Sequence, residues 1–308
     1  MTRAALLVVI TACGTPADSS ATDAAGDVPA DATPCGMRAG ARGLSMRHMM
    51  VSGLDRTYLV YLPPGSAETR MPLVFVHHGY TMSGQKMHDI TGYTALADSE
   101  HIAVAFPDGQ GGPDTFTAPW NVGVNVCAAA GGSAPPSATG DDFAFLDAMK
   151  ADIAADQCLD GDHVFLTGFS MGGYFSNHVG CMRPDIRAVA PHSGGAHELS
   201  GCVNAKRPII LFHGTADAVI PASCGDSAAS AWAAHNGCAT TFTTRAVQGG
   251  NCRHWDGCPA GGQVELCTFD NMAHCWAGGE QGAGIFSCPP YENATRLEWQ
   301  FWRDYAWN

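Results

Sequence analysis

Residues 163–182 read HVFLTGFSMGGYFSNHVGCM, and the fold can be inferred from this stretch more directly than from any other. Residues 163–167 have the apolar composition of a buried strand, whereas those from Gly172 onward have the pattern of a helix. Between them, residues 168–172 form a Gly-Phe-Ser-Met-Gly pattern at a sharp turn from strand to helix. Such a turn strains the backbone of Ser170, and glycines on either side avoid collisions with neighbouring backbone. The stretch therefore predicts a nucleophilic serine at a sheet edge.

Strands and helices alternate on both sides of this turn. An opening hairpin is indicated by two β-rich runs, 44–51 and 56–62. Five further apolar runs have the composition of buried parallel strands: 72–76, 102–106, 187–190, 208–212 and 264–269. Helical patterns lie between or after them, near 87–99, 141–157, 226–236 and 293–305. This alternation, without an internal repeat, predicts one α/β domain with a mostly parallel central sheet and helices on both faces.

The composition suits one large globular domain and argues against some partners. The chain has 308 residues, of which 46% are hydrophobic and 15% are charged. This length is well above that needed to bury a large core. The formal net charge is −13. Because nucleic acids and anionic membrane surfaces select basic proteins, we expect neither as the main partner. The sequence does not indicate an oligomeric state.

The N-terminus has the features of an export signal. Residues 1–12 hold a basic residue, a short apolar run and small residues, which predicts a cleaved signal peptide. The following Cys13 completes Ile-Thr-Ala-Cys, which resembles a bacterial lipobox, so we expect a lipid on Cys13 that anchors the protein to the outer membrane. Ordinary cleavage without lipidation is the alternative. The predicted segments are the signal peptide, a lipidated cysteine with a disordered tether over 13–34, and a catalytic domain over 35–308.

Cysteine usage indicates an oxidising compartment. The chain has 13 cysteines, and they do not form the paired C-x-x-C modules of many metal sites. Without Cys13 an even set remains, which suits up to six disulfides whose pairing the sequence leaves open: 35, 127, 158, 181, 202, 224, 238, 252, 258, 267, 275 and 288. We therefore expect an extracytoplasmic protein, either secreted or held at the cell envelope.

A serine hydroxyl needs a base to remove its proton and an acid to orient that base. In α/β-hydrolases the acid follows the serine in the chain, and the histidine comes last. After the run 208–212, the sequence HGTADAVIP places Asp217 in a tight loop at a strand end, where open α/β sheets hold their sites. Asp226 is the rival, but its position suggests the N-cap of the next helix. We expect His213 to pack beneath the loop.

His274 is the candidate base. It follows the last predicted strand, 264–269, and lies in the glycine-rich segment DNMAHCWAGG, residues 270–279. This place after both the serine and the acid is the one that the chain order requires. The neighbouring Cys275 offers a disulfide that would fix the loop. The rival is His254, which lies in a segment bounded by cysteines.

The candidate oxyanion hole follows an upstream strand. The run 72–76 ends in His-His-Gly-Tyr-Thr, residues 77–81. Gly79 allows the backbone to turn so that the amide of Tyr80 faces the nucleophile together with the amide of Met171. We expect these two amides to stabilise a developing oxyanion, and the two histidines to serve as scaffold.

Six motifs occur in a characteristic order: RTYLVYLPPG (56–65), HHGY (77–80), FPDG (106–109), GFSMGG (168–173), HGTADAVIP (213–221) and AHCWAGG (273–279). As an ordered set they resemble the family of secreted feruloyl esterases, acetylxylan esterases and polyhydroxybutyrate-depolymerase-like esterases. The resemblance covers nearly all of 35–308. It implies an α/β-hydrolase fold, ester hydrolysis through an acyl-enzyme, and a catalytic triad of Ser170, Asp217 and His274.

The same resemblance implies substrate contacts and shows departures. It implies that Trp120 and Trp276 bind substrate, although this chain has Trp-Ala-Gly where the family usually has Trp-Pro-Gly. Tannase-type relatives join cysteines next to the serine and the histidine, but position 169 here is Phe169. We find no separate polymer-binding module in the sequence, and this favours soluble or hemicellulose-bound esters over crystalline polyester. Acyl and alcohol specificity are expected in loops 107–140 and 277–292.

The leading hypothesis is a serine carboxylic-ester hydrolase that acts on plant cell-wall esters, feruloyl or acetyl, linked to polysaccharide. The close alternative is a hydrolase of polyhydroxyalkanoates or other polyesters. The alternative of a different class is a surface lipoprotein that binds a ligand without catalysis, but such a protein has no need of a full Ser/Asp/His set. No cofactor or metal is implied, since Asp141 and Asp142 are explained as the start of a helix.

Overall fold

The computed structural model describes residues 41–65, 69–115, 117–130 and 138–308. The described residues form one compact unit. The predicted signal peptide, the lipid on Cys13 and the tether therefore lie outside the described residues. Within the described ranges, no helix is long and apolar enough to cross a membrane.

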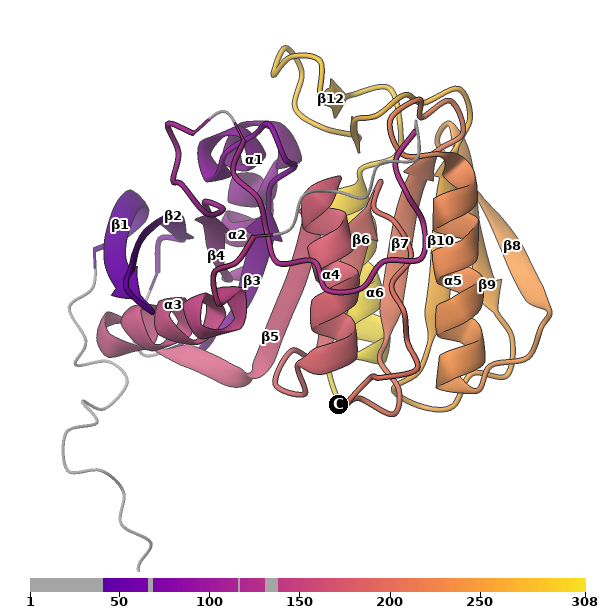
Figure 1. Ribbon diagram of the computed structural model, residues 1–308, viewed down its shortest axis with the longest axis horizontal. Coiled ribbons are helices and arrows are strands. Elements are labelled where there is room, and N and C mark those ends of the chain that lie inside the picture. Colours follow the sequence, from indigo (N-terminus) through magenta and orange to yellow (C-terminus); the bar gives the residue numbers. More distant parts are fainter. Residues whose placement is uncertain (1–40, 66–68, 116, 131–137) are drawn as a thin grey trace, which may run out of the picture. The chain divides into compact units, whose positions relative to one another are not determined.

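The described part of the chain is built around a ten-stranded sheet with the order β1-β2-β4-β3-β5-β6-β7-β10-β9-β8 (Figure 1). Its strands are β1 (Gly43–Val51), β2 (Leu54–Leu62), β3 (Met71–His77), β4 (Ala103–Pro107), β5 (Leu159–Phe169), β6 (Ala188–His192), β7 (Ile209–Gly214), β8 (Phe242–Val247), β9 (Gly250–Trp255) and β10 (Val264–Phe269). From β4 to β10 every neighbouring pair is parallel. Antiparallel hairpins, β1–β2 and β8–β9, extend the two edges.

Helices cover both faces of this sheet (Figure 1). They are α1 (Gly84–Thr91), α2 (Tyr93–Glu100), α3 (Asp142–Asp156), α4 (Met171–Met182), α5 (Ala222–Asn236) and α6 (Ala294–Tyr305). The buried side chains of α3, α4 and α5 belong to one apolar cluster, and those of α1, α2 and α6 belong to a second. The structure thus confirms the predicted α/β fold with a mostly parallel sheet between two layers of helices.

Three local features differ from the prediction. The helix expected over 87–99 is two helices, because Gly92 between α1 and α2 has a φ of 71° that ends one helix and starts another. Helix α5 begins before the expected residue 226, so Asp226 lies inside the helix rather than at its N-cap. The β8–β9 hairpin was not expected, because β8 exposes five of its six residues and lacks the apolar run of a buried strand.

Disulfides brace the domain, as the cysteine count predicted. Cys158 is disulfide-bonded, and the structure pairs ten further cysteines: 127 with 224, 181 with 202, 238 with 258, 252 with 267, and 275 with 288. The pair Cys127–Cys224 joins the loop after β4 to α5. Of the described residues, the one group with metal-ligating atoms close together is Cys252, Glu265 and Cys267, and its two sulfurs are joined to each other.

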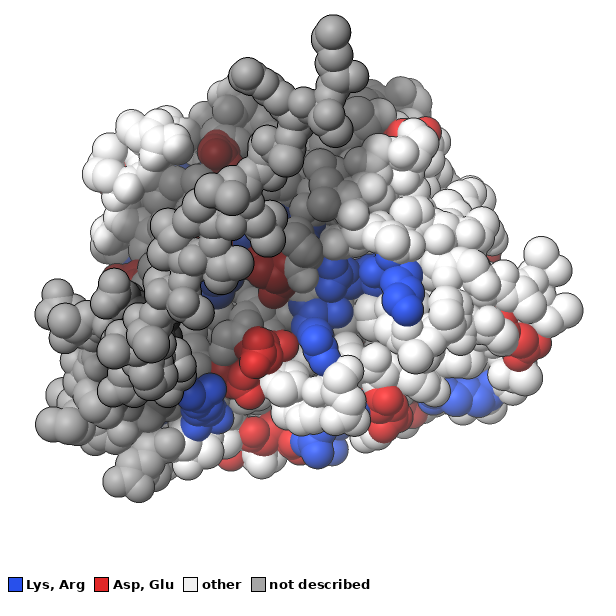
Figure 2. All heavy atoms as spheres, turned by 90° about the horizontal axis from the view of Figure 1, so that it is seen from below, with Lys and Arg blue, Asp and Glu red and all other residues white. Residues whose placement is uncertain are grey.

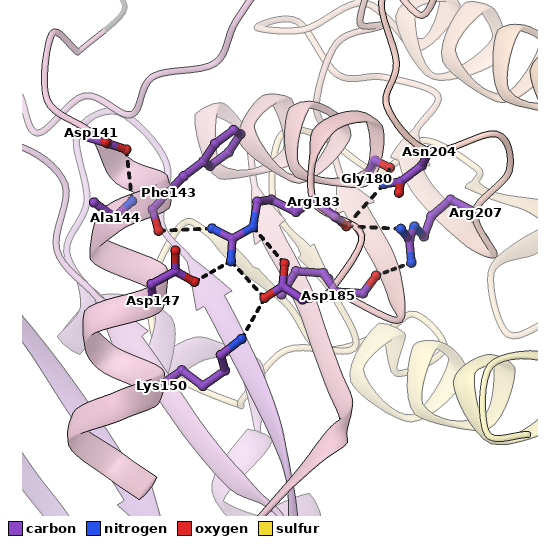
Figure 3. A network of polar contacts seen from close by, with 11 residues as sticks. Asp141, Phe143, Ala144, Asp147, Lys150, Gly180, Arg183, Asp185, Asn204 and Arg207 are labelled. Atoms are coloured by element: carbon purple, nitrogen blue, oxygen red, sulfur yellow. Dashed lines mark hydrogen bonds and ion pairs between the residues drawn. The ribbon is translucent and has the colours of Figure 1, made fainter. Parts of the chain in front are cut away.

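An ionic network fastens α3 to the C-terminal end of α4 (Figure 3). Arg183 donates from Nε to Asp185 at 2.7 Å, and Lys150 Nζ lies 2.7 Å from the same carboxylate. Asp141 caps α3, as expected, by accepting the Ala144 amide at 2.9 Å. On the face seen in Figure 2, Lys and Arg side chains are interspersed with Asp and Glu and do not form a separate basic patch.

Asp142 was expected only to start a helix, but it also forms a buried ion pair. Its carboxylate lies 2.8 Å from Arg56 Nη2, and both side chains are 1% exposed. The same carboxylate accepts the Asn121 amide at 2.6 Å. The pair therefore joins β2 and α3 to the loop after β4, and it is a structural ion pair.

Candidate active site

Ser170 lies in the turn that the sequence predicted. Strand β5 ends at Phe169, helix α4 begins at Met171, and Ser170 between them has φ 56° and ψ −114°. A positive φ is uncommon for a residue with a side chain and marks a strained turn. Both flanking glycines are required, since a Cβ on Gly168 would lie 2.4 Å from the Gly172 carbonyl oxygen, and one on Gly172 would lie 2.3 Å from the carbonyl oxygen of His77.

Asp217 and His274 are directly paired. The distance from His274 Nδ1 to Asp217 Oδ2 is 2.7 Å. Asp217 Oδ1 accepts the amides of Val219 and Ile220 at 2.9 and 2.8 Å, so the carboxylate is held from both sides. Burial alone would raise the pKa of Asp217. The hydrogen bond and charge of His274 and the two amides outweigh burial, so the pKa lies below its ordinary value.

Backbone contacts hold the loop of Asp217 against the loop of His274. Strands β7 and β10 are parallel neighbours, so both loops leave the same edge of the sheet. The Ala216 amide donates to the Met272 carbonyl oxygen at 3.0 Å, and the Asn271 amide donates to Thr215 Oγ1 at 2.8 Å. Close packing requires Gly214, where a Cβ would lie 2.2 Å from the Met272 carbonyl oxygen.

The His274 ring also reaches the turn that carries Ser170. Its centroid lies 4.6 Å from the ring centroid of Phe169, the residue before the serine. The structure therefore places the three candidate residues after β5, β7 and β10, with His274 paired to Asp217 and its ring against the residue that precedes Ser170. Phe169 offers no thiol next to the serine, and Cys275, next to His274, is paired with Cys288.

His254 and Asp226 have partners elsewhere, whereas His213 supports Asp217 from beneath, with its Nε2 3.6 Å from Asp217 Oδ2. His254 is in β9, with its Nδ1 3.2 Å from Glu265. Asp226, inside α5, contacts Arg253. His213 is 1% exposed beneath the Asp217 loop, and its Nε2 lies 2.9 Å from the Ile220 carbonyl oxygen.

The predicted oxyanion loop packs against the serine. A Cβ on Gly79 would lie 3.1 Å from Ser170 Cβ, so the backbone before Tyr80 approaches the nucleophile closely. His78 holds this loop, because its Nε2 accepts the Gly109 amide at 2.8 Å. Within the described part of the chain, no hydrogen bond engages the amides of Tyr80 and Met171. Both amides are therefore free to donate to a ligand.

Trp120 and Trp276 differ from the expectation that they bind substrate. Both side chains are 0% exposed. Trp120 stacks on Phe175 at 5.6 Å and donates from Nε1 to the His78 carbonyl oxygen at 2.9 Å. Trp276 stacks on His192 at 4.5 Å. Because neither offers an exposed face, both support the loops of the site and do not contact substrate in this conformation.

A groove of about 420 Å³ lies beside the site. Met82 connects it to the serine, since a Cβ on Gly79 would touch both Met82 Sδ and Ser170 Cβ at 3.1 Å. Its walls combine apolar, hydroxyl and charged side chains: Thr81, Met82, Ser83, Lys86, Pro113, Asp114, Thr115 and Phe286. Part of the wall comes from the two loops expected to set specificity. No pattern in the sequence singles out Lys86, on α1, or Phe286, in the second of these loops.

The fold and site define an esterase of the α/β-hydrolase class. A family model described as "Esterase PHB depolymerase" matches residues 56–205. A probable feruloyl esterase C of Aspergillus oryzae is 30% identical over 218 residues, which cover 66% of this chain and 72% of that protein. The chain belongs to this family of feruloyl and polyhydroxybutyrate-depolymerase-type esterases.

A further curated relative and a solved structure are also esterases. Feruloyl esterase B of Piromyces equi is 29% identical over 249 residues, or 74% of this chain; the match spans 44% of that longer protein. Among solved structures, an acetyl xylan esterase from Aspergillus awamori has a TM-score of 0.59 at 15% identity, covering 75% of this chain and 94% of the other. At that identity the likeness concerns the fold, which it confirms.

Proposed function

We propose that the protein hydrolyses carboxylic esters through Ser170, His274 and Asp217. The observation that carries the proposal is the strained Ser170 beside the 2.7 Å contact between His274 and Asp217. Because His274 Nδ1 carries the proton that it donates to Asp217, Nε2 is left with the lone pair that a general base requires.

The reaction proceeds in two halves. Ser170 Oγ attacks the ester carbonyl carbon as its proton passes to His274 Nε2, and the alcohol leaves with that proton. An acyl-enzyme on Ser170 results. A water molecule, deprotonated by His274, then attacks the acyl carbon and releases the acid. The amides of Tyr80 and Met171 stabilise the oxyanion in both halves, and loss of one such donor typically lowers kcat by ~10²–10³-fold.

Plant cell-wall esters, feruloyl or acetyl, are the proposed substrates. The names of the feruloyl esterase relatives favour them. The groove beside the site also suits an aromatic or sugar substituent, because it combines Met82 and Phe286 with three hydroxyl side chains. Hydroxyalkanoate esters are the second candidate, favoured by the description of the matching family model.

We further propose an extracytoplasmic location. Five disulfides between described cysteines require an oxidising compartment during folding. The lipobox-like sequence at Cys13 supports attachment to the cell envelope.

The decisive experiment is hydrolysis of p-nitrophenyl acetate by the wild type and by Ser170→Ala. We expect kcat to fall by ~10⁶-fold in the variant. Ser99→Ala, an exposed serine on α2, is the control and should retain full activity. Activity that survives Ser170→Ala contradicts the mechanism, and inactivity of all three proteins favours the ligand-binding alternative. Rates on methyl ferulate, acetylated xylan and hydroxybutyrate oligomers then distinguish the substrate classes.

A further inference from the structure

His192 lies between the strand that carries the serine and the strand that precedes the acid. It ends β6, where it pairs in register with Phe169 of β5 and Phe212 of β7. Its carbonyl oxygen accepts the Ser170 amide at 2.8 Å. The backbone of His192 therefore holds the strained turn at the nucleophile itself.

The His192 ring binds a different part of the site. It is fully buried and stacks between Trp276, with centroids 4.5 Å apart, and Phe212, with centroids 5.4 Å apart. Its Nε2 lies 3.1 Å from the amide nitrogen of Ala277, three residues after His274. A backbone amide only donates, so Nε2 must accept, and the ring proton of neutral His192 lies on Nδ1.

The His192 ring is expected to stay neutral, with its proton on Nδ1. Burial, followed by the nearby charges of His213 and His274, holds the pKa of His192 well below its ordinary value. Protonation of Nε2 would place two donors against each other at Ala277. His192 is therefore a fixed acceptor and not a second base.

We propose that His192 is a positioning residue that sets the distance between Ser170 and His274, and this inference rests on the proposed triad. One residue holds the Ser170 amide through its carbonyl oxygen and the loop after His274 through its ring. A phenylalanine would fill the same space but would leave the buried Ala277 amide without an acceptor. The loop would then shift while the Cys275–Cys288 disulfide still retained it.

The test compares His192→Phe with His192→Gln, because the glutamine Oε1 occupies about the place of Nε2 and can accept the Ala277 amide. The substrate is p-nitrophenyl acetate, and active sites are counted with a fluorophosphonate that labels Ser170. We expect kcat per labelled site to fall by ~10²-fold in His192→Phe, the effect of a displacement of about 1 Å. KM should change less than about twofold. His192→Gln should retain at least a third of the wild-type kcat.

A merely structural role would lower the number of labelled sites equally in both variants and leave kcat per site unchanged, which would overturn the proposal. An acid limb of the pH–rate profile that disappears in His192→Phe would also overturn it, because His192 would then act as a base. If Ser170→Ala retains activity, the proposed function itself fails, and the two failures are thus distinguishable.

Should His192→Phe not fold, ¹⁵N NMR of the wild-type imidazoles decides, with His192→Gln assigning the signal by its loss. We expect an unprotonated Nε2 and a protonated Nδ1 throughout pH 5–8. A proton on Nε2 in this range would contradict the proposal.

Discussion

Asp217 and Glu298 both bury a carboxyl group within the domain, but different donors surround them. Asp217 meets the imidazole of His274 and two backbone amides. Among the described residues, the hydrogen-bond partners of Glu298, on α6, are the hydroxyls of Tyr93 and Thr167. The pKa of Asp217 is lowered, whereas burial raises the pKa of Glu298 well above its ordinary value. Burial acts on both groups in the same direction, so the donors decide which one is charged.

The hydrogen bonds of Thr167 support a neutral Glu298. Its Oγ1 lies 2.7 Å from the Ala190 carbonyl oxygen and 2.9 Å from Glu298 Oε2. A hydroxyl has one proton, and the carbonyl can only accept it. Thr167 can therefore donate fully to only one of these two oxygens, so Glu298 receives less stabilisation of its charged form than Asp217 does. The two buried carboxyls thus have pKa values shifted in opposite directions.

Of the changes to these two carboxyl groups and their partners, Asp217→Asn should have the largest effect, and that effect is on kcat. The amides of Val219 and Ile220 would hold the oxygen of the asparagine, so its NH2 group would face His274 Nδ1 as a donor. The imidazole proton would then lie on Nε2, the wrong tautomer for a base, and kcat should fall by ~10⁴-fold. Steady-state hydrolysis of p-nitrophenyl acetate measures it. Glu298→Gln is the matched control, because the same chemical change there should leave kcat within about twofold. Equal losses in both variants would contradict the different roles assigned to the two carboxyls.

Glu298→Gln should instead change how stability depends on pH. The folded pKa of Glu298 lies above the unfolded one, so its contribution is complete below the unfolded pKa, about 4.3, and is lost as pH rises toward the folded pKa. Glutamine keeps both hydrogen bonds and cannot ionise. Relative to the variant, the wild type should lose up to about 1.4 kcal/mol of unfolding free energy per pH unit above that point. Urea denaturation between pH 4 and pH 8 measures this difference, and parallel pH curves would indicate that Glu298 is ionised in the fold.

Tyr93→Phe should have the smallest effect. The change removes the phenol that donates to Glu298 and leaves one oxygen of a buried carboxyl without a donor. We expect a loss of about 1–3 kcal/mol in unfolding free energy, with esterase activity retained. Thermal denaturation at pH 6 provides the measurement. An unchanged melting temperature would show that Tyr93 does not stabilise the buried acid.

The parallel core of the fold could be predicted because each central strand is a short apolar run between helices. The serine turn, the acid loop and the histidine loop could be placed because they follow such strands in a fixed order. Strand β8 could not be predicted, since an exposed edge strand leaves no apolar run. The split at Gly92 was also missed, because a single glycine is compatible with a continuous helix until its φ is known.

The supporting residues of the site were harder to predict than the candidate triad. Trp120 and Trp276 were expected at the substrate from the family resemblance, but a matching motif does not show whether a tryptophan lines a pocket or packs in the core. His192 and Glu298 belong to no motif, and their importance comes from contacts with residues distant in the chain, such as Ala277 and Tyr93. Such contacts exist only after the sheet has assembled.

The residues of the candidate site come from two separate parts of the chain. Ser170 and both proposed oxyanion amides lie within the residues 56–205 that the family model matches, whereas Asp217 and His274 come from the last third of the chain. A protein cut between β6 and β7 would hold a nucleophile on one piece and its base on the other. The Cys127–Cys224 disulfide crosses this cut, so an oxidised protein would keep its two pieces linked, and hydrolysis would require β6 and β7 to remain paired.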